Sequence, residues 1–448
     1  MTSLGGLEAP ASIDHHKPPL CLHRAQHGID ANAVDDAALT VVQGLQDAGF
    51  DAFLVGGCVR DLLLGLSPKD FDVATNATPE DVKRVFRRAR LIGRRFRIAH
   101  VRVGREVIEV STFRQRAVAE DVTHARSRRD LKDLVTARSA EGLILRDNAY
   151  GTIDEDAFRR DFSVNALYYD PVTETVLDYV GGLDDLRQRR LRLIGDAATR
   201  LREDPVRILR AVRFAAKLDF DIDPETRDAI PHVASSIDSV APARLFDELC
   251  KLFLLGHAAA AWELLQELGL VSTLFPDLRR SQQLDRLIAT AMRGTDDRVK
   301  EDKPVTPGFL FAVLLWDSYQ EKVAQYAEDR TLADPREAAS SATLQDRGSK
   351  IVLPKRHAQF VREVWSLQPR LEAPKPRTVE RLVAHPRFRA AYDFLLLRAE
   401  SGEIDRTMAD WWTSYQAEDT KTRAALRSEL VPDKARRRRR RSRRPPAS

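Results

Sequence analysis

The first 180 residues carry short apolar runs and helical repeats, separated by glycine, proline and charged residues. Apolar residues that return every three to four positions indicate amphipathic helices, whereas short apolar runs bounded by turn residues indicate strands. The pattern predicts helices at 36–48, 59–64 and 79–89 and strands at 51–55, 71–74, 99–103 and 106–113. The last two strands are close enough to form a hairpin, so this part of the chain is expected to fold as a small α/β unit.

Beyond about residue 180 the strand signals stop, and a helical pattern interrupted by proline and glycine continues to about residue 430. A small α/β unit followed by an all-helical half predicts the α+β fold class. Residues 1–35 are rich in proline, histidine and glycine without a sustained period, so the pattern assigns no structure to this extension. Residues 115–145 are charged and weakly periodic and are expected to form a mobile loop or a poorly packed excursion.

Composition excludes several classes of protein. Cys21, Cys58 and Cys250 are far apart and lack a CxxC spacing, which argues against a disulfide framework or a structural zinc site. No apolar run is long enough to span a membrane, and no secretion signal is recognisable. We therefore expect a soluble, cytoplasmic protein with no membrane partner.

Positive charge is concentrated at two places. The net charge is +5, but residues 434–444 contribute nine positive charges, so residues 1–433 carry a net charge of −4. The arginine-rich tail, from 432 to 448, is expected to be disordered. Residues 83–105 contain ten lysines and arginines and no acid. Such a window predicts a polyanionic partner nearby.

A predicted strand ends at Gly56 and Gly57, and a predicted helix follows at once. The backbone donors of such a turn can approach a phosphate because no bulky side chain is in the way. The chain has no P-loop, and the GxGxxG fingerprint is absent after this strand. Asp70 and Asp72 follow on the next predicted strand, where a period of two points both carboxylates to one face.

Two like charges on one strand face favour a bound cation between them. Carboxylate oxygens suit Mg²⁺ that carries a triphosphate, so Asp70 and Asp72 predict metal-assisted phosphoryl transfer. Ile108 and Val110 share one face of the predicted strand, so Glu109 lies on the other face. On that face a neighbouring strand could place Glu109 beside the aspartate pair. An ordinary surface glutamate is the equal alternative for Glu109.

A third cluster of polar residues occupies 159–167, which reads RRDFSVNAL. Its arginines could clamp phosphates, while Asp161 and Asn165 could reach ribose hydroxyls or a metal.

The segment 203–214 predicts a helix with Asp204 as its N-cap and Pro205 at its first position. Asp204 and Arg207 are three residues apart, so they could present an acceptor and a donor to one base edge. Adenine and cytosine offer the matching donor and acceptor, whereas guanine and uracil reverse them. The pair alone therefore leaves adenine and cytosine open.

Four motifs follow one another at 54–61, 70–75, 159–167 and 203–214. In this order they resemble the class II nucleotidyltransferases, which comprise CCA-adding tRNA nucleotidyltransferases and bacterial poly(A) polymerase I. The resemblance is strong over residues 50–235 and loose over the helical half. The chain looks more like poly(A) polymerase I because of the arginine tail and the stretches at 93–101, 145–148 and 385–393.

The resemblance implies a small palm sheet with helices, followed by an all-α neck and body. It divides the chain into an N-terminal extension (1–35), a nucleotidyltransferase head (36–180), a base-recognising neck (181–240), an RNA-binding body (241–431) and the tail (432–448). It implies active-site aspartates at Asp70, Asp72 and Asp161, of which Asp70 and Asp72 hold the metal. The residues expected to bind the nucleotide are Gly56, Gly57, Arg60, Arg160, Asn165, Asp204, Arg207 and Arg210.

We therefore expect template-independent transfer of AMP from ATP to the 3′ hydroxyl of RNA, with Mg²⁺ activating the hydroxyl and stabilising the departing pyrophosphate. RNA 3′ ends and ATP are the expected partners. A CCA-adding enzyme shares every chemical motif and is the first alternative. An RNA-binding protein that keeps the palm without turnover is the second, and the intact Asp70, Asp72 and Asp161 disfavour it.

Overall fold

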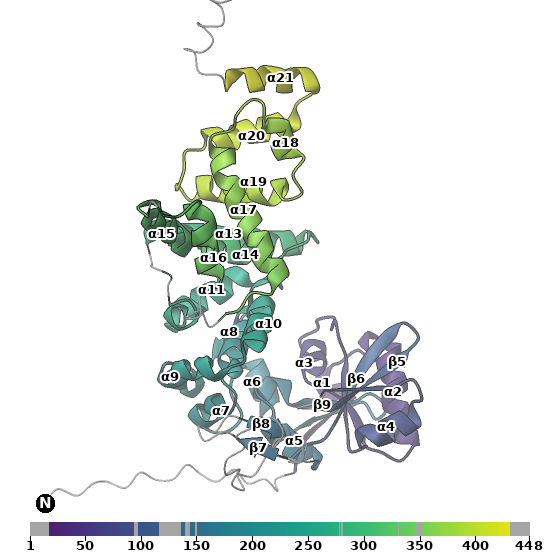
Figure 1. Cartoon of the computed structure of the whole chain (residues 1–448). Coiled ribbons are helices and arrows are strands. Elements are labelled where there is room, and N and C mark those ends of the chain that lie inside the picture. The colour runs from purple at the N-terminus through teal and green to yellow at the C-terminus, as the bar shows by residue number, and fades with distance from the viewer. Residues whose placement is uncertain are drawn as a thin grey trace, which may run out of the picture. The chain divides into compact units, whose positions relative to one another are not determined.

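The computed structural model of the chain describes residues 18–93, 97–115, 136–138, 144–147, 150–276, 278, 281–329, 331–345 and 351–430. The chain divides into two compact units, Met1–Ser236 and Ile237–Ser448 (Figure 1). The first unit holds a mixed sheet with helices, and the described part of the second consists of helices and their connections. The α+β class expected from the sequence is confirmed.

An eight-stranded sheet organises the first unit. Its strands are β1 (Leu20–His23), β2 (Ala52–Val55), β3 (Asp72–Thr75), β4 (Arg90–Ile92), β5 (Ile98–Val103), β6 (Glu106–Thr112), β9 (Leu167–Asp170) and β10 (Thr175–Asp178). Their order across the sheet is β1-β10-β9-β2-β3-β6-β5-β4. β3 and β6 pair in parallel, and the other neighbours are antiparallel. The parallel pair is what brings two distant acids opposite each other.

Helices and short strand pairs complete the first unit. The helices are α1 (Arg24–His27), α2 (Asp36–Asp47), α3 (Gly57–Leu63), α4 (Pro79–Val85), α5 (Ile153–Arg159), α6 (Gly182–Arg187), α7 (Ala197–Glu203), α8 (Val206–Leu218) and α9 (Pro224–Val233), with 3-10 turns at Ala31–Ala33, Ser163–Asn165 and Ala234–Ser239. β11 (Arg190–Leu191) pairs with β12 (Asp221–Ile222), and β7 (Thr136–Arg138) pairs with β8 (Ile144–Asp147).

Local sequence explains where α2 begins and which face it buries. The Asp35 carboxylate accepts hydrogen bonds from the backbone N–H groups of Ala37 and Ala38 at 2.8 and 3.1 Å, which satisfies two donors of the first turn. Apolar residues at helical spacing then face the sheet and are fully buried, namely Val41, Val42 and Leu45. Burial of this stripe ties α2 to β2, β3, β5 and β6.

Some elements differ from the predicted pattern. β1 lies in the extension to which the sequence assigns no structure, because a four-residue edge strand is too short to show a period and is held by pairing with β10. β11 and β12 lie beyond residue 180 and are only two residues long. The predicted mobile loop at 115–145 falls mostly outside the described residues. The arginine tail, 432–448, falls outside them entirely.

The described helices of the second unit surround aromatic cores. They are α10 (Pro242–Phe253), α11 (Ala258–Glu267), α12 (Val271–Leu274), α13 (Gln282–Lys300), α14 (Pro307–Leu314), α15 (Trp316–Ala327), α16 (Pro335–Leu344), α17 (Lys355–Glu372), α18 (Val379–Val383), α19 (Phe388–Glu400), α20 (Thr407–Ala417) and α21 (Thr420–Glu429). The indoles of Trp365 and Trp412 are buried and donate to the carbonyls of Ala312 and Leu371 at 3.0 and 2.9 Å. Within the described residues, no helix has both the length and the apolar character to cross a bilayer.

Candidate active site

The predicted order of strand, two glycines and helix is present between β2 and α3. Gly56 has φ +82° and ψ −130°, a backbone conformation that side chains other than glycine rarely adopt. A Cβ atom at Gly56 would lie 3.7 Å from Nη1 of Arg160 and 3.8 Å from the carbonyl oxygen of Asn165. The turn thus brings the backbone of β2 beside two of the residues that were expected to bind the nucleotide.

The carboxylates expected to bind a metal lie at the start of β3. Asp72 is the first residue of that strand and faces Glu109 in the register, with Asp70 two residues earlier. Asp72 remains solvent-accessible, yet partial desolvation by the surrounding protein, followed by the charges of Glu109 and Asp70, raises the pKa of its carboxyl from 3.8 to about 6. The charge of Arg160 acts in the opposite direction. The structure therefore gathers mutually repelling carboxylates at one place on the sheet.

Two carboxylates are a suitable protein contribution to a Mg²⁺ site. In the described part of the chain, no group of three or more His, Cys, Asp or Glu side chains is arranged to hold a metal ion. Mg²⁺ usually takes one or two carboxylates and completes its shell with water and substrate phosphates. Asp70 and Asp72 fit that requirement, and a cation between them would relieve the repulsion that raises the pKa of Asp72.

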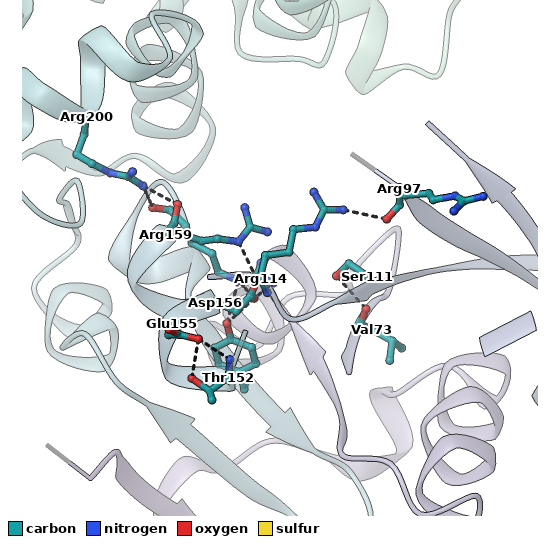
Figure 2. A network of polar contacts seen from close by, with 11 residues as sticks. Val73, Arg97, Ser111, Arg114, Thr152, Glu155, Asp156, Arg159 and Arg200 are labelled. Atoms are coloured by element: carbon teal, nitrogen blue, oxygen red, sulfur yellow. Dashed lines mark hydrogen bonds and ion pairs between the residues drawn. The ribbon is translucent and has the colours of Figure 1, made fainter. Parts of the chain in front are cut away.

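Arg160 is held beside this region by a buried carboxylate that the sequence analysis missed. Asp156 is 1% exposed, and its carboxylate accepts from Nε of Arg159 at 3.0 Å (Figure 2). It also accepts from Nη2 of Arg160 at 2.9 Å and from the hydroxyl of Tyr168 at 2.8 Å. Burial alone would raise the pKa of Asp156, but Arg160 and Arg159 outweigh it and lower that pKa. Asp156 and Arg159 lie on α5 and Arg160 directly follows it, so the spacing of three and four residues from Asp156 was an available signal.

Among the described residues, the hydrogen-bond partners of Asp161 are groups other than Asp70 and Asp72, namely Arg210, Asn165 and the backbone of Phe162. Its Oδ2 accepts from Nε of Arg210 at 2.7 Å, and its Oδ1 accepts from the backbone N–H of Phe162 at 2.8 Å and from Nδ2 of Asn165 at 3.4 Å. Oδ1 of Asn165 in turn accepts from Nη1 of Arg60 at 2.6 Å. Burial opposes the charged form, yet Arg210 and the Phe162 N–H lower the pKa of Asp161 to about 2. The structure thus joins Arg60, Asp161, Asn165 and Arg210 in one chain of hydrogen bonds between α3, the turn at 163–165 and α8.

The prediction that Asp204 is the N-cap of α8 is wrong. Asp204 ends α7 with an extended backbone (φ −150°, ψ 92°), and Pro205 directly precedes the helix without a capping side chain. The backbone N–H of Arg207 nevertheless donates to the carbonyl of Asp204 at 2.9 Å, so the two residues remain neighbours. Pro205 has helical dihedral angles but lies just before the first residue of α8. The N-cap position is therefore one residue later than the sequence predicts.

Arg207 is buried and held from one side. Its Nη1 donates to the carbonyl of Arg200 at 2.6 Å and lies 3.5 Å from Oε2 of Glu203. Burial lowers the pKa of Arg207, and the charges of Asp204, Asp161 and Glu203 counteract this. Within the described part of the chain, Nε and Nη2 of Arg207 have no hydrogen-bond partner. An arginine in this state can donate to a ligand from a fixed position.

Arg200 is another residue that the sequence analysis missed. Its side chain is 2% exposed, and Nη1 lies 2.5 Å from Oε2 of Glu203. Nη2 donates to the carbonyls of Arg159 and Arg160 at 2.5 and 2.7 Å (Figure 2). Arg200 therefore fixes the backbone just before Asp161 against α7, and no short sequence motif signals a contact over forty residues.

Comparison with known proteins matches these features to one family. The poly(A) polymerase head-domain model covers residues 52–192, the model for a probable RNA- and SrmB-binding site of polymerase A covers 219–281, and the model for the arginine-rich C-terminus of polymerase A covers 328–445. Poly(A) polymerase I of Salmonella typhimurium is 43% identical over 427 residues, which cover 93% of this chain and 90% of that protein. The chain belongs to the poly(A) polymerase I family. It is accordingly a nucleotidyltransferase, of the polynucleotide adenylyltransferase type.

CCA-adding enzymes are more distant relatives of this poly(A) polymerase I family member. The enzyme of Geobacillus stearothermophilus is 36% identical over 252 residues, which cover 56% of this chain and 57% of that protein. The solved structure of the Thermotoga maritima CCA-adding enzyme complexed with tRNA-CCA has a TM-score of 0.58 at 18% identity and covers 91% of this chain and 90% of that one. At that identity the likeness shows a shared fold.

Proposed function

We propose that this protein adds AMP from ATP to the 3′ hydroxyl of RNA without a template and releases pyrophosphate. The observation that carries the proposal is the grouping of Asp70, Asp72 and Glu109 on one part of the sheet, within reach of the charge of Arg160. Family membership supports adenylate transfer, and the expected site of action is the cytoplasm.

Asp70 and Asp72 are the residues that would hold Mg²⁺. When bound there, the ion supplies Lewis-acid stabilisation of charge on the phosphates and on the attacking oxygen. The chain itself contributes a turn at Gly56 and Gly57 that lets phosphates approach the backbone, and Arg160, which the Asp156 carboxylate holds in position. Because these groups are already placed, little reorganisation is needed when the nucleotide binds.

Asp161 is better suited to positioning than to metal binding. Its carboxylate is engaged by Arg210, by a backbone N–H and by Asn165. We expect this chain, which continues to Arg60, to set the position of the ribose and of the α8 arginines. Burial opposes its charge, but Arg210 and the Phe162 N–H hold the pKa of Asp161 well below its usual range, so the carboxylate is ionised at neutral pH.

Base selection is assigned to Asp204 and Arg207. Arg207 can donate from Nε and Nη2 while its Nη1 stays on the Arg200 carbonyl, and Asp204 lies next to it as an acceptor. The pair matches adenine and cytosine, so the choice of adenine depends on a pocket that the larger purine fills.

The test compares an unstructured RNA primer with a tRNA that lacks its 3′ CCA, each with Mg²⁺ and one nucleoside triphosphate at a time. We expect many A residues on the plain primer from ATP, weak use of CTP, negligible use of GTP and UTP, and no stop after three additions. Addition of only C, C and A, restricted to the truncated tRNA, would instead identify a CCA-adding enzyme.

Two variants link the activity to the site. Asp70→Asn should abolish incorporation, while Glu106→Gln, an exposed position on β6, should not. Arg207→Ala should raise the fraction of wrong nucleotides, because the donor that rejects guanine and uracil is gone. Activity of Asp70→Asn within tenfold of wild type would refute the metal assignment.

A further inference from the structure

One part of the sheet face that carries Asp72 is uncovered among the described residues. Over β2 and β9 this face is buried, with Val55 and Tyr168 packed against Ala157 of α5. Over β4, β5 and β6 the same face carries exposed residues beside the half-buried His100, whereas the alternate residues Ala99 and Ile108 are buried on the side of α2 and α4.

A row of register partners leads from the carboxylates to the edge of the sheet. Asp72 of β3 lies opposite Glu109 of β6, Glu109 opposite His100 of β5, and His100 opposite Arg90 of β4. The side chains of two of these pairs also interact. Glu109 raises the pKa of Asp72, and Nε2 of His100 lies 3.1 Å from Oε1 of Glu109. Three steps between neighbouring strands place Arg90 about 14 Å from Asp72.

Cations and apolar side chains alternate along this uncovered face. Arg102 follows His100 by two residues on β5, so it points to the same side, and its register partner is Val107 of β6. Val107 is 45% exposed, and Ile92, two residues after Arg90 on β4, is 44% exposed. We call Arg90, Ile92, Arg102 and Val107 the edge strip.

The two arginines of the edge strip differ from Arg84 and Arg97 of the same basic window. Arg84 is 2.7 Å from Asp81, and Arg97 is 2.7 Å from Glu80, so their charges are compensated. Arg90 and Arg102 are exposed and have no hydrogen-bond or ion-pair partner among the residues that the structure describes. Unpaired cations on the same sheet face as Asp72 and Glu109 favour binding of a polyanion whose end must reach those carboxylates.

We propose that the edge strip binds the RNA primer just upstream of its 3′ end, with Arg90 and Arg102 contacting phosphates and Ile92 and Val107 contacting bases. The inference rests on the proposed function, which requires an RNA 3′ hydroxyl at Asp70 and Asp72. A single strand alternates charged phosphates with apolar base faces, which matches the alternation on the strip. The charged contacts are to the RNA backbone and the apolar contacts are to the faces that all bases share, so binding is expected to be independent of sequence.

The test uses the double variant Arg90→Ala/Arg102→Ala in the full chain. Loss of two phosphate contacts to a single strand should lower the slope of log K against log salt by about 1.4 and weaken primer binding about 25-fold at about 0.1 M monovalent salt. The KM for the primer should rise accordingly, while the KM for ATP and the kcat at saturating primer should stay unchanged. Arg90→Lys/Arg102→Lys, which keeps both charges, should recover most of the affinity.

Lys83→Ala is the matched control, because Lys83 is an exposed cation of the same basic window on α4, on the other side of the sheet. It should leave the affinity and the salt slope near the wild-type values. An equal loss in Lys83→Ala, an unchanged slope in the double alanine variant, or a parallel rise in the KM for ATP would each overturn the proposal. A wild-type protein that binds primer but adds no A residues would instead refute the proposed function, and the primer affinities would still test the strip.

Discussion

Asp72→Asn should make the first unit more stable at neutral pH even though it abolishes transfer of AMP. The carboxyl of Asp72 has its pKa raised from 3.8 to about 6, so the folded state disfavours its charged form. A shift of about two pKa units corresponds to a folding penalty of about 3 kcal/mol when fully expressed. Because Asp72 is solvent-accessible, screening should reduce this to about 1 kcal/mol.

The penalty has a defined pH window. Since the folded pKa lies above the unfolded one, the wild type suffers no penalty while the carboxyl is protonated in both states, below about pH 4. Stability is lost as the pH rises from there through about 6, and the loss is complete above that value. The variant has no charge to lose, so its advantage should grow over the same range.

Thermal unfolding in a metal chelator measures this directly. At about pH 8, Asp72→Asn should melt about 2–4 °C above the wild type, and at about pH 5 the gain should be about half as large. Glu106→Gln removes an exposed carboxylate on the opposite face of β6 and should show no such pH-dependent gain. Mg²⁺ should raise the melting temperature of the wild type and not that of the variant. A lower melting temperature for Asp72→Asn at pH 8 would mean that this carboxylate stabilises the fold, against our reasoning.

Three further changes test the parts that surround the carboxylates. Asp156→Asn leaves two arginines without their buried anion and should cost about 3–5 kcal/mol in urea unfolding; an unchanged unfolding midpoint would contradict the role of Asp156. Gly56→Ala places a side chain at φ +82° and should cost about 1–3 kcal/mol, measured in the same way. Arg210→Met removes the partner of Asp161 and should raise the KM for ATP about tenfold, which corresponds to about 1.4 kcal/mol of lost binding free energy. The KM is measured by steady-state kinetics at saturating primer, and an unchanged KM would contradict a role for the pair.

Local sequence was sufficient to predict β2, β3, β5 and β6, but not β4, β9 or β10. The strands that carry Asp72 and Glu109 have alternating or apolar patterns and lie between clear turn signals, so their existence could be predicted. The parallel pairing of β3 with β6 could not be predicted, because no short-range signal specifies pairing between strands that are separated by other elements. β1 was missed for a related reason, since its stability comes from pairing with β10.

Contacts over long sequence separations explain the other gaps. Arg200 reaches the carbonyls of Arg159 and Arg160 about forty residues away, and neither partner offers a side-chain motif for this. An acidic residue before a proline is typical of an N-cap, so the sequence predicts that role for Asp204. In the structure Pro205 itself lies just outside the helix. Packing between distant elements explains the first case, and the local backbone geometry of Pro205 explains the second.

The resemblance implies active-site aspartates at Asp70, Asp72 and Asp161, with the metal on Asp70 and Asp72, and in the structure Asp72 and Asp161 have opposite charge environments. The pKa of Asp72 is raised by partial desolvation and by other acids, whereas the pKa of Asp161 is lowered by Arg210 and a backbone N–H. A carboxylate whose charge is uncompensated gains most from a cation brought by the substrate, while one already paired gains little. The metal is therefore expected at the sheet, and Asp161 is expected to hold the arginine of α8 in place. Under the same reasoning, the exposed Arg90 and Arg102 on the sheet face are proposed to serve the RNA, whereas Arg210 already donates to the Asp161 carboxylate.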